Sequence, residues 1–191
     1  MDLRVVILPV GKIEPAEIEA VGARVAKVVN HAVEAGAPVA VPKAGDDPAR
    51  GQHLAAPFLA ALKAALPKTG PAPDAAIFVT DVDLYRPQTD GVFGEIDARG
   101  KAAVLSVRRL REAFYKRKAD PAKQRARLVK MTLFALGRIR GLTDCRDPQC
   151  VMAAMTSLAD VDGRGERYCA TCWKRAISMS KPSNDSAGSW P

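Results

Sequence analysis

All four cysteines of this 191-residue chain lie in its last quarter, as the pairs Cys145/Cys150 and Cys169/Cys172. Their spacing is C-x4-C-x18-C-x2-C, and ligands separated by two to four residues reach one tetrahedral zinc ion from a single turn. Two disulfides or a redox-active CxxC are the alternatives. We predict one structural Zn(Cys)4 site, which is closed and leaves no coordination position open for chemistry.

The order of hydrophobic segments predicts an α/β fold, with a mixed sheet covered by helices and a small C-terminal zinc-binding lobe. Strands are expected at 3–10, 38–42 and 75–85, a hairpin at 91–109, and helices at 15–36, 52–66 and 121–141. The last helix follows Asp120-Pro121, a pairing of capping residue and first-turn proline that is typical of a helix start. We divide the chain into an N-terminal subdomain (1–141), the zinc lobe (142–177) and a disordered tail (178–191).

Composition and hydropathy predict a cytoplasmic protein without a membrane partner. No apolar run approaches the roughly 18–20 residues that cross a bilayer. The N-terminal sequence MDLRVVILPVGK has no small-residue cleavage site of the secretory type. In the cytosol, clustered cysteines favour metal binding over disulfides.

The sequence around the first cysteine pair carries a family resemblance. FALGRIRGLTDC (134–145) is followed by RDPQ, Cys150, Val151 and Met152, and 16 residues then separate Met152 from CATC. This frame resembles the archaemetzincins, a branch of the metzincin zinc peptidases, which carry HExxHxxGxxxC-x4-C-x-M and then CxxC. ILPVGKI, TDVDLY, GVFGE and AVLSVRRLR upstream resemble the family's strands. The resemblance implies a metzincin-like sheet, with Met152 as the methionine of the turn beneath the active site.

The catalytic positions of that frame are altered. The resemblance places Phe134 at the first zinc histidine, Ala135 at the general-base glutamate, Arg138 at the second histidine and Asp144 at the third. A catalytic zinc needs about three protein ligands and a water position. Phenylalanine and alanine donate nothing, and an arginine guanidinium stays protonated and repels a cation. We therefore expect no catalytic residues, no catalytic zinc and no metzincin-type reaction.

The chain's two histidines do not repair this loss, because His31 and His53 lie far from the helix in sequence. On that helix, Phe134 could fill the space of the metal. Arg138 could pair with Asp144, or it could hold an anionic or peptide ligand in the altered cleft.

Segment 108–130 holds ten Lys or Arg and two acids, an excess equal to the whole chain's net charge of +8. Such a surface could bind nucleic acid through phosphate contacts. The alternative is a solvated surface balanced by acids elsewhere in the fold. A second candidate surface is GVFGE (91–95), an expected edge strand that could pair with an extended peptide.

The sequence as a whole predicts an archaemetzincin-like pseudo-peptidase with one structural zinc and a binding or regulatory role. A zinc-dependent metallopeptidase with a rearranged site is one alternative. A basic nucleic-acid-associated protein is the other.

Overall fold

The computed structural model describes residues 4–66 and 71–178. The element order is β1 (Val5–Val10), α1 (Pro15–Val29), β2 (Val33–Ala35), β3 (Asp46–Asp47), β4 (Gln52–Leu54), α2 (Ala55–Ala64), β5 (Ala75–Thr80), β6 (Leu84–Tyr85), β7 (Gly94–Asp97), β8 (Ala102–Ser106), the 3-10 helices η1 (Arg108–Leu110) and η2 (Glu112–Tyr115), α3 (Pro121–Ile139), α4 (Leu158–Gly163) and α5 (Ala170–Ser178). Of the tail predicted at 178–191, all but Ser178 lies outside the described residues. Among the described residues, none of the helices has the length and apolar character needed to cross a membrane.

A five-stranded mixed sheet of order β2-β1-β5-β8-β7 forms the centre of the molecule. The first four strands are parallel, and β7 pairs with β8 in the antiparallel direction, as the predicted hairpin requires. A second sheet, of order β3-β4-β6, lies beside it. The predicted α/β fold class with a mixed sheet is confirmed.

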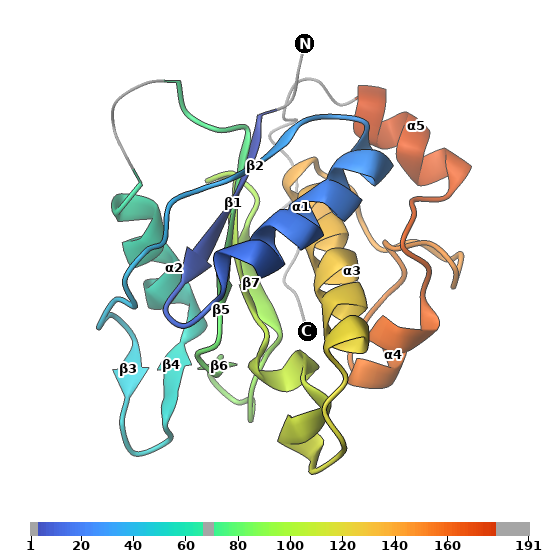
Figure 1. The fold of residues 1–191 in the computed structure, drawn as a ribbon. Helices are drawn as coiled ribbons and strands as arrows, with labels where there is room; N and C mark the ends of the chain where they lie inside the picture. The colour runs from blue at the N-terminus through green and yellow to red at the C-terminus, as the bar shows by residue number, and fades with distance from the viewer. Residues whose placement is uncertain (1–3, 67–70, 179–191) are drawn as a thin grey trace.

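Helices cover both faces of the central sheet, with α1 and α3 on one side and α2 on the other (Figure 1). Side chains alternate along each strand, so Ile7 and Ile77 join the hydrophobic cluster beneath α1 and α3. Their neighbours Leu8 and Phe78 join the cluster beneath α2. Every residue of β5 is buried, as expected for a central strand covered on both faces.

Two predictions near the N-terminus are wrong. The helix begins at Pro15 but ends at Val29, because Asn30 takes a left-handed conformation (φ 55°) and its N–H caps the Ala26 carbonyl. The chain then turns directly into β2, inside the range expected to be helical. The strand predicted at 38–42 supplies the isolated bridge between Val39 and Val10.

Two further segments divide between elements. The helix predicted at 52–66 begins as the short strand β4 and becomes helical only at Ala55. The strand predicted at 75–85 breaks after Thr80, whose hydroxyl accepts a hydrogen bond from the Val82 amide. The Val82 carbonyl accepts a hydrogen bond from the Ser106 hydroxyl, and the chain passes into β6 of the second sheet.

The cysteine segment packs against the same core as the sheet. One buried cluster contains Leu105 of β8, Leu133 of α3, and Cys150 and Met152 from the chain beyond α3. The domain boundary after residue 141 stays a prediction, and the buried residues on its two sides are continuous.

Candidate functional site

The four cysteine thiols meet at one point. Their Sγ atoms all lie within 4.8 Å of one another, and those of Cys145 and Cys169 are 3.7 Å apart. A tetrahedral zinc ion with bonds of about 2.3 Å would hold four sulfurs about 3.8 Å apart. All four cysteines are free, and Cys150 and Cys172 are buried. The group could hold a zinc ion, and that it does so stays a prediction.

The backbone around the cysteines is arranged for sulfur ligands. The Cys145 amide donates to the Met152 carbonyl at 2.8 Å, which closes the loop carrying the first pair. The second pair lies at the start of α5. Amides also point at sulfur: Cys169 N lies 3.2 Å from Cys150 Sγ, and Cys172 N lies 3.5 Å from Cys169 Sγ. Such N–H groups stabilise negative charge on thiolates.

The thiols differ in acidity without a metal. Burial raises the pKa of Cys150 and of Cys172. The Cys172 amide instead lowers the pKa of the Cys169 thiol. Binding of a cation would oppose the effect of burial on Cys150 and Cys172, which is the usual coupling between metal binding and thiol deprotonation.

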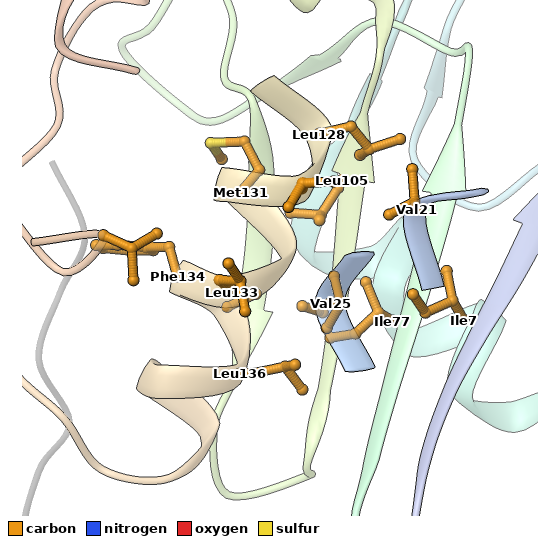
Figure 2. Close-up of a cluster of buried hydrophobic side chains, with 14 of the residues drawn as sticks. Ile7, Val21, Val25, Ile77, Leu105, Leu128, Met131, Leu133, Phe134 and Leu136 are labelled. Atoms are coloured by element: carbon orange, nitrogen blue, oxygen red, sulfur yellow. The ribbon is translucent and has the colours of Figure 1, made fainter. Parts of the chain in front are cut away.

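Helix α3 carries the positions that the resemblance aligns with the family's zinc motif, and its start follows the predicted pattern. The Asp120 carboxylate accepts from the Lys123 amide at 2.9 Å, and Pro121 occupies the first turn. In Figure 2, Leu133 and Leu136 point from α3 toward the sheet and α1, whereas Phe134 points to the opposite side.

By their helical spacing, Met131, Phe134, Ala135 and Arg138 share one face of α3, where a cleft is expected, and three of these four side chains are buried. Met131, Phe134 and Ala135 are at most 2% exposed, while the Arg138 side chain is 22% exposed. The chain's own side chains therefore cover those three positions. A ligand at Arg138 stays a prediction.

Two arginines lie close to the Phe134 ring. The guanidinium carbons of Arg138 and Arg164 are 5.1 and 5.4 Å from its ring centroid, within the range of cation–π attraction. Arg138 also forms the anticipated ion pair with Asp144, at 2.6 Å. Two positive charges thus flank the position that the resemblance gives to the first zinc ligand.

Arg164 was not anticipated from the sequence. It is 3% exposed and donates to the carbonyl oxygens of Val151 at 2.8 Å and Ala154 at 3.2 Å. Burial lowers the pKa of this guanidinium, although arginine keeps its charge even when its pKa falls. Nothing in the sequence near residue 164 indicates the contact with Phe134, which depends on tertiary packing.

The cysteine segment is tied to the altered helix by two further contacts. A Cβ atom added to Gly137 would lie 2.3 Å from Met152 Sδ, so glycine permits Met152 to pack directly against α3. The Tyr168 hydroxyl donates to the Leu133 carbonyl at 2.5 Å, and burial raises the pKa of that tyrosine. Met152 therefore packs directly against α3, and its role as the methionine of the turn beneath the active site stays a prediction.

The histidines remain apart from both regions. His53 lies on β4 with its Nε2 atom 3.7 Å from Asp46 and its ring edge against Phe58. His31 follows the end of α1. Within residues 4–66 and 71–178, the group of side chains able to hold a metal ion is the cysteine group.

The helical half of the basic segment is occupied by internal contacts. Arg125 pairs with Glu17 at 2.7 Å, and the Lys130 ammonium donates to two main-chain carbonyls of α4. Arg127 is 1% exposed and pairs with Asp162 at 2.7 Å and Glu112 at 2.5 Å. This half of the segment agrees with the alternative in which acids elsewhere in the fold balance the charge.

Comparison with known proteins gives a consistent result. The model of "Peptidase family M54" matches residues 73–177. The archaemetzincin of Thermococcus kodakarensis is 33% identical over 130 residues, which cover 68% of this chain and 69% of the relative. That of Methanocaldococcus jannaschii is 36% identical over 102 residues, and the match covers 53% of this chain and 57% of the relative.

Solved structures share the fold. The archaemetzincin of Methanopyrus kandleri superposes with a TM-score of 0.74 at 27% identity, covering 92% of this chain and 95% of that one. A zinc-dependent peptidase from Methanocorpusculum labreanum gives a TM-score of 0.80 at 23% identity, covering 90% and 99% of the two chains. The sheet, its helices and the cysteine segment therefore form one recurring architecture.

Proposed function

This chain belongs to the archaemetzincin family, peptidase family M54, and from that premise we propose that it is a pseudo-peptidase with a binding or regulatory role. The observation that carries this proposal is the Phe134 ring, which is 2% exposed and has two guanidinium groups within 5.4 Å of its centroid. A phenyl ring offers no lone pair to zinc, and the adjacent cations raise the electrostatic cost of bringing Zn²⁺ there. Asp144 is the remaining oxygen donor of the motif positions, and Arg138 engages it.

The general base is the second part of the proposal. Metal-dependent peptide hydrolysis needs a group that takes a proton from the attacking water. Ala135 stands at the position of the family's glutamate, is fully buried and has no titratable atom. Because these positions offer neither a general base nor metal ligands, we assign the scaffold a binding role without catalysis.

The zinc of this chain, in the proposal, is the one held by Cys145, Cys150, Cys169 and Cys172. Four sulfur ligands leave no position for water, so the ion would stabilise the fold. Its place fits that role, because the cysteine loop and α5 attach to α3 through Met152 and Tyr168.

The binding role rests on β7. This strand is at the edge of the central sheet, and an extended peptide can add to such an edge through main-chain hydrogen bonds. The Arg86 Nε atom lies 2.7 Å from the Glu95 carboxylate of β7. This ion pair fixes the position of the Glu95 side chain on the strand.

A hydrolysis assay tests the proposal. We expect this chain to leave a fluorogenic peptide library uncut with or without a chelator, while the Methanocorpusculum labreanum peptidase serves as the comparator. An Asp144→Asn variant is the matched control, because it replaces the remaining carboxylate at the motif positions with a neutral amide, a much weaker metal ligand. Chelator-sensitive cleavage that Asp144→Asn abolishes would establish instead a metallopeptidase with a rearranged site.

A further inference from the structure

The loop half of the basic segment differs from the helical half. Residues 108–118 lie between the sheet and the start of α3 (Figure 1), where they form the 3-10 helices η1 and η2 and the first residues after η2. Arg108, Lys116 and Lys118 are exposed and Arg111 is partly exposed. Within the part of the chain that the structure describes, none of these four side chains takes part in an ion pair.

The acids near this loop are already engaged. Glu112 is 7% exposed and bound by Arg127 and Lys123. Asp120 caps α3. Asp83 receives two hydrogen bonds from Arg109, at 2.7 and 2.9 Å. The four unpaired cations of the loop therefore present a net positive surface.

An aromatic ring stands on the same loop. Phe114 is 38% exposed, one of two large hydrophobic side chains exposed to that degree among the described residues. The Arg109 guanidinium carbon is 4.9 Å from its centroid, and the Tyr115 ring meets it edge-on at 5.0 Å. These neighbours fix the ring while leaving part of it open to a partner.

We propose that residues 108–118 bind single-stranded nucleic acid without sequence preference, a property beyond the proposed pseudo-peptidase role. The cations would contact successive phosphates, and Phe114 would stack on a base. Phosphate contacts alone would suit any polyanion. The exposed, braced ring favours a ligand with planar bases over an acidic peptide.

Salt dependence measured by fluorescence anisotropy tests the phosphate contacts. With labelled oligothymidylate as the probe, four contacts predict that log K falls against log[KCl] with a slope of about −3, since each contributes roughly 0.7 for single strands. Lys116→Gln/Lys118→Gln should reduce the slope by about 1.4. The matched control Lys27→Gln/Lys43→Gln removes two exposed charges elsewhere and should leave it unchanged. Equal reduction in both double variants would overturn the assignment.

Phe114→Leu tests the stacking contact, because leucine keeps apolar area but removes the ring. We expect oligothymidylate binding to weaken at least about fivefold, with an unchanged salt slope and thermal midpoint. A labelled poly-glutamate peptide of equal charge is the competing probe. If it binds as tightly as the oligonucleotide and Phe114→Leu has no effect on either, nucleic acid is excluded and the surface belongs to an acidic protein segment.

Discussion

Replacing Cys150 with serine is expected to abolish tight zinc binding and to unfold the part of the chain beyond α3. Cys150 is 1% exposed, and its sulfur accepts hydrogen bonds from the amides of Met152 and Cys169. Structural zinc contributes on the order of 10 kcal/mol of apparent binding free energy in zinc-finger peptides at neutral pH. Loss of one thiolate ligand should remove most of that binding free energy. The zinc content and the thermal midpoint of wild type and variant measure the two expected losses, of zinc binding and of stability.

Thr171→Ser is the matched control for that experiment. Thr171 lies between the cysteines of the second pair in sequence and is exposed, so its change should alter neither zinc content nor thermal midpoint. Limited proteolysis should then cut Cys150→Ser within 142–177 while leaving the control intact. A thermal midpoint of Cys150→Ser equal to or above that of wild type would contradict a structural role for the cysteine group.

Arg127→Leu is expected to destabilise the protein by about 3–5 kcal/mol, the usual consequence of removing one partner of a buried ion pair. The guanidinium is 1% exposed and joins Glu112 of η2 to Asp162 of α4. It also donates to the Leu110 carbonyl at 2.7 Å. Leucine would leave Glu112 buried with reduced compensation, from Lys123 at 3.1 Å and from the exposed Arg117 at 3.4 Å. Urea denaturation measures the free energy of unfolding.

Arg117→Leu separates the effect of burial from the loss of charge. Arg117 pairs with the same Glu112, at 3.4 Å, but its side chain is 61% exposed. An exposed pair contributes about 0–1 kcal/mol, so this variant should stay close to wild type. Equal destabilisation by the two variants would show that net charge, and not the buried contact, determines the result.

The same cluster predicts a dependence on pH. The Lys123 ammonium and the Arg127 guanidinium lower the pKa of Glu112, and Arg127 lowers the pKa of Asp162. In an unfolded chain the pKa values of Glu and Asp carboxyls are about 4.3 and 3.9. The contribution to stability is therefore complete above about pH 5 and is lost as the pH falls through the folded-state pKa values. Arg127→Leu should flatten this acid limb of the stability profile.

Local signals predicted the site better than they predicted the sheet. The cysteine spacing depends on two turns, and the structure brings all four sulfurs together. The capping aspartate and proline located the start of α3 correctly. Short strands such as β2 and β4 have only three residues each, too few to show a period. Their place depends on pairing with distant strands.

The contacts of Arg164 and Arg127 could not be inferred from spacing. Arg164 lies 30 residues beyond Phe134 in the chain and reaches its ring only because the segment after Met152 folds back onto α3. In the sequence, nothing separates Arg127 from the other cations of the basic segment 108–130. Its burial depends on acids 15 and 35 residues away, which periodicity does not reveal.

The most direct test of the account is the zinc content per chain, measured by elemental mass spectrometry on protein purified without added metal. The account predicts one zinc, held by the cysteines and lost together with folding in Cys150→Ser. Two zinc ions, the second removable by mild chelation while the fold persists, would contradict it. The region around Phe134 and Arg138 would then have to contain ligands for a catalytic metal.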